Sequence, residues 1–258
     1  SVTLNEGLKT IASGAFRSNK LTSIDIPDSV TKIETTAFNT NNINGPDGII
    51  YGRTTSGPDY GYIVSYAGGN TAGSLTIPAT KNGVKLRQIG GSAFADCALT
   101  DVTLPDISQT NSLSISTNAF IRNRISSSSS SAYNNGGFFC KVSSGVIDCS
   151  TISSYGGTTS GTITIPDTIN GTTVKRVSAY FTWMSYSKLV LPSYSDLVLD
   201  NGVFGKSARN NQNLKTIVNK SGKSFAWDKI TSTSITANNT FVTGTITHEA
   251  GNIEVVSG

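Results

Sequence analysis

Residues 21–43, LTSIDIPDSVTKIETTAFNTNNI, decide the fold, because their apolar spacing L-xx-I-x-I-P-xx-V-xx-I-xxx-A-F recurs along the chain. This spacing fits neither a sustained helical period nor strict alternation. Ile24 and Ile26 lie two residues apart, which predicts a short strand ended by Pro27 with both side chains on one face. The later apolar residues are expected to turn inward: Val30, Ile33, Ala37 and Phe38. One such unit cannot bury its own apolar face, so it needs neighbours stacked on both sides.

Near-copies of the unit keep two fixed spacings. Residues 2–16 match residues 24–38 at an offset of 22. An isoleucine lies four residues before the Ala of each Ala-Phe pair, and a Leu or Ile lies five residues after the Phe: Ile11, Ile33, Ile89 and Ile115 before, Leu21, Ile43, Leu99 and Ile125 after. We therefore predict a repeat solenoid, β-rich with short helical turns, whose coils share one continuous interior. Its inward column is expected to be Ile26, Ile77, Leu104, Ile165 and Leu191.

Two larger cassettes interrupt the simple coils, at about residues 44–94 and 132–183. In the first, aromatic and β-branched runs on either side of residues 56–59 predict a β-hairpin. A five-residue expansion around Asn82-Gly83 predicts a second, smaller hairpin. The second cassette repeats these landmarks 88 residues later, including Asn170-Gly171. We expect the hairpins to protrude from the solenoid.

The hairpin CKVSSGVIDC (residues 140–149) predicts a disulfide. A turn at residues 144–145 sets an apolar pair and an opposite-charge pair across the hairpin, Val142 with Ile147 and Lys141 with Asp148, and such pairs support the register. Cys140 then faces Cys149, at a Cα separation that a disulfide tolerates. An oxidising compartment would allow that bond to form. The alternative is two reduced thiols that pack as small hydrophobic residues. Cys97 follows an Ala-Phe turn and is expected to be a buried free thiol.

The last part of the chain departs from the repeat. Residues 177–184 spoil the Ala-Phe spacing, and residues 189–204 restore it. Residues 220–258 contain two β-like runs, at 241–247 and 253–256. Because a terminal repeat must cover the last open layer, we expect a cap at about residues 219–258. The chain as a whole, residues 1–258, is predicted to be one solenoid domain.

Composition narrows the functional classes. The chain is 36% apolar and 14% charged, which suits a thin solenoid with polar turns. Its formal charge of +4 is small and its basic residues are scattered, whereas nucleic-acid binding usually needs a clustered basic face. There is no run of 18 apolar residues, so we expect no insertion into a membrane. Three cysteines and one histidine, His248, argue against a zinc site, and we expect no metal or other cofactor.

We find no set of residues that predicts catalysis. A nucleophilic triad needs a base, usually a histidine oriented by a carboxylate, and His248 lies beside Glu249 in the tail. Paired carboxylates can hydrolyse glycosidic bonds, but Asp25 and Asp28 belong to a strand and a turn, and a solvated face explains both. The dispersed aspartates form no calcium loop, and no phosphate-binding GxxxxGK[ST] motif occurs. We therefore expect no enzymatic activity and no catalytic residue.

Two surface features remain. A threonine column is expected beside the inward strand positions (Thr3, Thr76, Thr103 and Thr164), broken by Asp25, Val190 and Val218; threonine ladders can bind ordered surfaces, but threonine also simply suits exposed strands. The irregular segments hold aromatic residues, which bind sugars by stacking and proteins as anchors. Our candidate binding residues are Tyr60, Tyr62, Trp183 and Tyr186. The alternative is that most of these aromatic side chains form local core.

The pattern seen whole at residues 21–38 resembles the BspA-type leucine-rich repeat, with repeats of 22–23 residues and a proline after each strand: Pro27, Pro78, Pro105, Pro166 and Pro192. The Cys that is usual after Ala-Phe occurs only at Cys97. The resemblance implies an exported bacterial protein at the cell surface, often assigned to adhesion or host contact, and implies no shared catalytic residues.

From this resemblance we expect an extracellular, monomeric, non-enzymatic recognition module that binds a host or matrix protein, or a glycan. The alternatives are a structural stalk or spacer within a larger surface protein, and a carbohydrate-capturing module.

Overall fold

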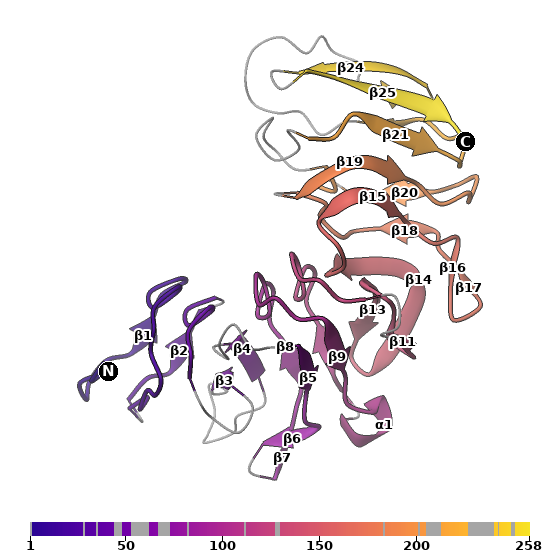
Figure 1. Ribbon diagram of the computed structural model, residues 1–258. Coiled ribbons are helices and arrows are strands. Elements are labelled where there is room, and N and C mark those ends of the chain that lie inside the picture. Colours follow the sequence, from indigo (N-terminus) through magenta and orange to yellow (C-terminus); the bar gives the residue numbers. More distant parts are fainter. Residues whose placement is uncertain are drawn as a thin grey trace.

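The protein is described by a computed structural model that covers residues 2–27, 29–34, 36–43, 48–52, 62–66, 73–81, 83–110, 112–126, 130–182, 184–200, 202–204, 213–226, 240–241, 243–248 and 251–258. It is a solenoid of stacked β-coils, which confirms the predicted fold class (Figure 1). The stack runs in one direction from β1 to β13 and turns into another from β14 to β25 (Figure 1). Only one short helix occurs among the described residues, α1 (Ile107–Thr110).

Ten strands form the sheet that we call the main sheet. Along it the order is β20 (Val198–Leu199), β18 (Arg176–Val177), β14 (Val146–Tyr155), β13 (Phe138–Ser143), β10 (Ser114–Ile115), β8 (Gln88–Ile89), β4 (Tyr62–Tyr66) and β3 (Ile49–Gly52). Two further strands, β11 (Ser130–Ser131) and β12 (Asn134–Asn135), join it through β13. Two of the isoleucines that lie four residues before an Ala-Phe pair, Ile89 and Ile115, pair with each other in this sheet, whereas Ile11 and Ile33 pair in a separate two-stranded sheet.

A second set of strands ends just before the repeated prolines, and we call its sheets the pre-proline sheets. One contains β5 (Ser74–Thr76) and β9 (Asp101–Thr103). The other contains β15 (Ser160–Thr164), β19 (Ser185–Val190), β21 (Thr216–Asn219), β25 (Gly251–Ser257) and β24 (Gly244–His248). The predicted threonine column is present only in part: Thr76 pairs with Thr103, but Thr164 lies in a separate sheet, where it pairs with Val190, and Thr3 lies in no strand. In the tail, β25 extends this sheet beside β21 and β24 forms its outer edge.

The first two coils differ from the prediction. Residues 24–26 are not a strand; the strands here are β1 (Thr10–Ile11) and β2 (Lys32–Ile33), which pair in parallel. The backbone hydrogen bonds explain this difference, because Lys32 and Glu34 donate to the carbonyls of Lys9 and Ile11. A strand needs a partner ladder, and in these coils the ladder forms at the later isoleucine.

The small hairpins project from the stack, whereas the large hairpins are part of the main sheet. The small pairs β6 (Thr80–Lys81) with β7 (Val84–Lys85), and β16 (Thr168–Ile169) with β17 (Thr172–Thr173), project from the stack as expected (Figure 1). The large pairs β3–β4 and β13–β14 do not protrude, because they are strands of the main sheet. The expectation that the cassettes protrude as a whole was therefore wrong: the edge of each large hairpin pairs with a neighbouring coil. Strand β22 (Phe225–Ala226) pairs with β23 (Thr240–Phe241) in a separate antiparallel pair.

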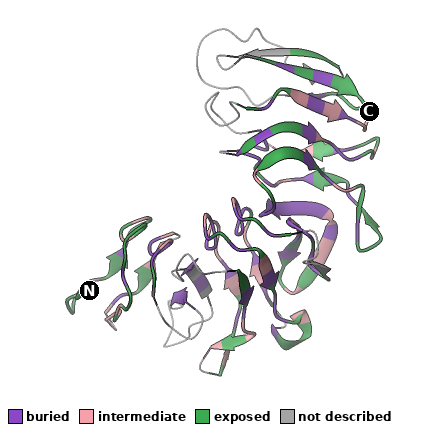
Figure 2. Ribbon diagram, viewed as in Figure 1, coloured by how far each residue is buried: buried purple, intermediate pink, exposed green. Residues whose placement is uncertain are grey.

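The buried side chains form three clusters rather than the single interior that we predicted. The first contains Ile11 and Phe38, the second Ile77 and Leu104, and the third Ile165 and Leu191. The divisions fall at the large hairpins, since neighbouring residues there enter different clusters: Ile49 and Ile50 in β3, Phe139 and Cys140 in β13. Partly buried Ile147 packs against both the second and third clusters. Buried residues recur in each coil, and exposed ones predominate on the β16–β17 hairpin (Figure 2).

A column of buried polar residues ties successive Ala-Phe turns together. Asn123 accepts a hydrogen bond from the Leu99 amide (3.0 Å) and donates to the carbonyls of Phe94 (2.8 Å) and Phe120 (2.7 Å). Asn41 makes the same three bonds two Ala-Phe turns earlier, and both side chains are at most 1% exposed. Cys97 occupies the same column, three residues after its Phe, and is a buried free thiol as predicted. Burial raises the pKa of that thiol.

An ion cluster spans the division between the first two cores. Asp96 accepts hydrogen bonds from Nε and Nη2 of Arg122, each at 2.6 Å, and pairs with Arg17 of the first coil. Burial acts to raise the pKa of Asp96, but the two guanidinium groups outweigh it and hold that pKa below its ordinary value. Nearby, Asn39 donates to the carbonyl of Ala95 (3.0 Å). These bonds join coils whose apolar side chains belong to different clusters.

Candidate functional site

The hairpin β13–β14 builds the candidate site. Its turn residues Ser144 and Gly145 have φ of 49° and 78°, the left-handed values that a tight two-residue hairpin needs. Beyond the turn the register follows the prediction: Val142 pairs with Ile147 and Lys141 with Asp148. The turn is anchored to β10, because the Ser144 amide donates to Ser114 Oγ (2.9 Å).

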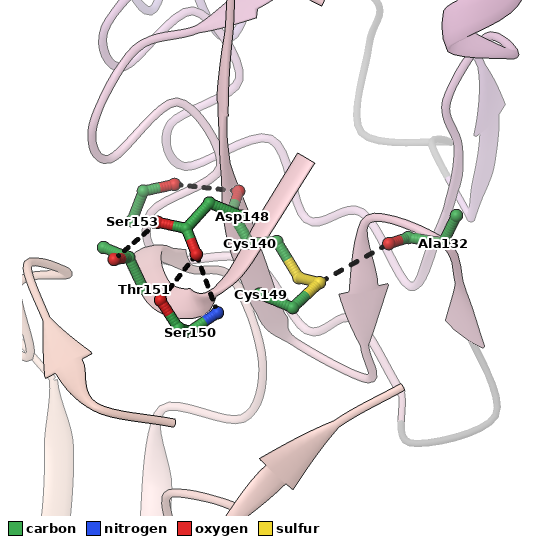
Figure 3. The surroundings of a disulfide bond; sticks show 7 residues. All are labelled: Ala132, Cys140, Asp148, Cys149, Ser150, Thr151 and Ser153. Atoms are coloured by element: carbon green, nitrogen blue, oxygen red, sulfur yellow. Dashed lines mark hydrogen bonds between the residues drawn. A yellow bond between two sulfur atoms is a disulfide. The ribbon is translucent and has the colours of Figure 1, made fainter. Parts of the chain in front are cut away.

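The ladder then shifts, which the sequence did not predict. Cys140 pairs with Ile152, not with Cys149, so residues 149–151 form a bulge in β14. Cys140 and Cys149 are nevertheless joined by a disulfide, with their Cα atoms 4.5 Å apart (Figure 3). The predicted pair of cysteines is the one that is bonded. The bond therefore links the base of the hairpin across the bulge.

Asp148 holds the bulge from the other side (Figure 3). Its Oδ1 accepts hydrogen bonds from the Ser150 amide (3.0 Å) and hydroxyl (2.5 Å), and its Oδ2 accepts one from the Thr151 hydroxyl (3.0 Å). Burial acts to raise the pKa of Asp148, but these bonds and nearby Lys141 hold that pKa below its ordinary value. The carboxylate is thus ionised at neutral pH.

After the bulge, β14 also pairs with β18. Thr151 and Ile152 pair in parallel with Arg176 and Val177 of β18. Ile152 and Val177 are fully buried in the core, while the residues on either side of each lie on the opposite face of the sheet. The main sheet consequently carries an outward row of polar side chains across β10, β13, β14 and β18.

These outward side chains line an open groove of about 890 Å³. Nine of its lining residues carry hydroxyl groups or charges on the strands or directly after them: Ser114, Ser116, Lys141, Ser143, Asp148, Thr151, Ser153, Arg176 and Ser178. Thr117, Tyr180 and Asp200 extend the lining beyond the strands. We call this the main-sheet groove. Side chains from segments that span more than 80 residues of sequence meet in it.

The charges in the groove are balanced. Arg176 pairs with Asp200 (Nη2 to Oδ1, 2.6 Å), and Ser178 also donates to that carboxylate. Burial acts to raise the pKa of Asp200, but the bonds from Arg176 and Ser178 and the charge of Lys141 hold that pKa below its ordinary value. Two carboxylates therefore face two cations, Lys141 and Arg176. Such a groove offers many hydrogen-bond donors and acceptors without attracting one sign of charge.

Tyr180 is the aromatic residue of the groove. Its side chain is 37% exposed, and its amide donates to Asn118 Oδ1 (2.9 Å), which fixes the backbone. Gly202 lies against the ring: a Cβ there would come within 2.9 Å of a ring carbon. The ring is therefore supported on one edge by backbone, and it remains accessible beside the polar row.

Of the four aromatic binding residues proposed from the sequence, the structure describes the side chain of Tyr186 alone. Tyr60 and Trp183 lie outside the described residues. Only the backbone of Tyr62 is described, as the first residue of β4. Tyr186 was wrong as a surface binding residue, because it is 1% exposed and its hydroxyl donates to the Phe181 carbonyl (2.8 Å). Its burial raises the pKa of the hydroxyl, and it belongs to the core.

The main-sheet groove was missed from the sequence. The signal was available in part, since Arg176 and Ser178 flank Val177, which corresponds to the isoleucine that precedes each Ala-Phe pair. Knowing that this position is a strand would have placed its flanking residues outward. The contribution of Lys141 and Asp148 could not be foreseen, because it depends on β13 entering the sheet.

Neither a metal site nor a spanning helix is found in the described parts. No group of three or more His, Cys, Asp or Glu side chains there is placed to hold a metal ion. Nor does any helix in the same ranges have the length and apolar character needed to cross a bilayer.

Comparison with known protein families identifies one family model that matches this chain. The model for the BspA type leucine rich repeat region matches residues 1–46 and 72–157, in six copies and over more than half of the chain. No curated protein and no solved structure gives a significant match. The matched residues include the coils whose pairing is described above. The chain belongs to the BspA-type leucine-rich repeat family.

Proposed function

We propose that this chain is a non-enzymatic recognition module displayed at a bacterial cell surface, and that its main-sheet groove holds a segment of a host protein or a glycan. The observation that carries the proposal is Tyr180, an accessible aromatic ring beside a charge-balanced polar groove. Family membership supports a role in interaction, because repeat solenoids commonly use the extended surface made by their stacked strands.

The composition of the groove supports polar ligands. Hydroxyl, carboxylate and guanidinium groups can each exchange hydrogen bonds with sugar hydroxyls or with peptide groups. An exposed aromatic ring adds an apolar contact that keeps much of its strength in water. The disulfide and the Asp148 bonds fix the positions of Lys141 and Thr151, so less conformational freedom is lost on binding.

The test is a glycan array run beside a binding screen of extracellular-matrix proteins, using the whole chain. Each ligand found is then titrated against Tyr180→Ala and Arg176→Ala variants. We expect each variant to weaken binding about tenfold, since truncating an anchoring interface residue typically costs more than 1 kcal/mol. The matched control is Tyr194→Ala, because Tyr194 is half-buried and does not line the groove.

Arg176→Ala should leave folding intact, because its ion pair with Asp200 is exposed and exposed pairs contribute little stability. Unchanged affinity in both groove variants would refute the groove as the binding site. A chain that binds nothing in either screen would instead favour the spacer role.

A further inference from the structure

The strand ladder of the pre-proline face is interrupted between β9 and β15. The coil that opens at Ile125 supplies β14 to the main sheet, but its described residues supply no strand to the pre-proline face. On the main sheet β13 and β14 both lie between β10 and β18, so three strand spacings, about 14 Å, separate those two strands. On the pre-proline face β9 and β15 belong to separate sheets. The inserted strand β13 therefore spreads the coils apart.

A second groove, of about 710 Å³, lies at this interruption. One wall is formed by residues 124–126. The amides of Arg124 and Ser126 donate to the carbonyls of Leu99 and Thr100, the two residues just before β9. The other wall comes from residues of β15, and no residue of its partner β19 lines the groove. Within the described ranges β15 pairs with β19 alone, so the groove runs along its other, open edge, and it shares no lining residue with the main-sheet groove.

The floor of this second groove is apolar. Ile125, Tyr155 and Ile163 line it with exposures of 3%, 3% and 1%. A strand lying beside β15 would direct alternate side chains toward this floor and the others outward. Arg124 supplies the charge among the lining residues and is exposed. The site therefore suits a segment with alternating apolar residues and an acidic one.

The edge of β15 lacks two of the usual protections. Natural edge strands are protected by lysine, proline, a β-bulge or a covering element. The sequence of β15, SGTIT, contains neither lysine nor proline, while its ladder with β19 shifts register between Gly161 and Thr162. An open strand edge presents backbone donors and acceptors at the strand repeat, and an extended backbone is the group that matches that spacing.

We propose that the free edge of β15 is a strand-accepting site that binds an extended, acidic-apolar peptide segment of a partner protein by β-addition. The order of apolar and polar residues expected in the bound peptide is taken from the chain's own strand on this face. In residues 101–104, which comprise β9 and the residue after it, the buried Val102 and Leu104 alternate with Asp101 and Thr103, and Pro105 follows. A segment of this kind would fill the position that the interrupted ladder leaves open.

The probe is a fluorescein-labelled peptide with the sequence of residues 99–105, LTDVTLP, titrated with the whole chain and followed by fluorescence anisotropy. Two control peptides carry backbone N-methyl groups on alternate residues, one at the positions of Asp101 and Thr103, the other at those of Val102 and Leu104. In a strand only one of these sets of N–H groups can face β15. We expect one control to bind about tenfold more weakly or worse and the other to bind like the parent.

Hydrogen exchange of the whole chain locates the peptide. We expect slower exchange at residues 160–164 when the peptide is bound, and no change at residues 244–248, which form the edge strand β24 of the same sheet. Absence of saturable binding overturns the proposal. So do equal affinities for the two methylated peptides, because a groove that reads side chains alone would not distinguish them. Protection at β24 instead of β15 overturns it as well.

Discussion

Replacing Asn123 by alanine should be among the most destabilising single changes in the chain. The side chain is 1% exposed and satisfies three backbone groups in three segments: the Leu99 amide and the carbonyls of Phe94 and Phe120. Leu99, Phe94 and Phe120 are themselves fully buried, so water cannot replace the lost partner without opening the core. A buried polar group left unsatisfied costs about 1–3 kcal/mol.

Counting the amide and one carbonyl as unsatisfied gives a loss of about 2–6 kcal/mol in the free energy of unfolding. That is a large part of the 5–15 kcal/mol, approximately, that holds a typical domain together. In a repeat array the loss should appear first in the neighbouring coils, because each coil depends mainly on its neighbours. Unfolding in urea, followed by circular dichroism, measures it.

The control is Asn19→Ala. Asn19 occupies the same column in the first coil but is exposed, and its amide donates to the Arg17 carbonyl at 3.3 Å. We expect this variant to lie within about 1 kcal/mol of the unmodified chain. If Asn123→Ala costs no more than Asn19→Ala, the asparagine column does not hold the turns together and the reasoning is wrong. Asn123→Cys should be intermediate, because Cys97 is accommodated in the same column.

Three further predictions concern the joints between coils. Replacing Cys140 and Cys149 together by serine should lower the free energy of unfolding by about 2–3 kcal/mol, as expected for a loop closed by a sequence separation of 9, and reductant should then have no further effect in urea unfolding. Gly137→Ala should destabilise by at least about 1–3 kcal/mol, because its Cβ would lie 2.3 Å from the Gly157 backbone, whereas Gly73→Ala meets its nearest atom at 3.5 Å and should be tolerated; equal melting temperatures would contradict this. The pKa of Asp96 is lowered on folding, so its stabilising effect is complete above the unfolded pKa of about 3.9 and is lost as the pH falls through the lower folded pKa. Asp96→Asn should therefore flatten the decline of stability below about pH 4, and an unchanged acid-unfolding profile would count against the ion cluster.

The stacked coils could be predicted from the sequence because the repeated apolar residues and prolines are regularly spaced. The isoleucine before each Ala-Phe pair and the proline after each strand fix the length of a coil, and a coil of fixed length can bury its apolar residues only by stacking. The small hairpins followed from their Asn-Gly turns, since Asn170 and Gly171 adopt the left-handed φ values of 50° and 76°. The cysteine pair was predicted from the hairpin register, which holds from Lys141 and Asp148 to the turn; the disulfide forms although the ladder shifts at Cys140.

The failures share one cause. Whether a hairpin protrudes or enters a sheet depends on which strand edge lies free beside it, and that is a property of the neighbouring coils rather than of the hairpin. Placing β13 inside the main sheet brings Phe139 and Cys140 to different cores and carries Lys141 into the groove. Tyr186 was misassigned for a related reason: an aromatic residue in an irregular segment becomes core when the segment folds onto a coil.

Strand β13 is an interior strand of the main sheet, with partners on both sides, and the main-sheet groove depends on this position. Amide hydrogen exchange across residues 138–143 tests this most directly. We predict that the amides of β13 that bond to either β10 or β14 exchange slowly, at rates like those of β14. Both turn amides should be protected too, because Ser144 donates to Ser114 Oγ and Gly145 donates to the Leu113 carbonyl. Fast exchange at every second residue of β13, as in a hairpin with one edge in water, would contradict the inserted strand and with it the groove that the strand builds.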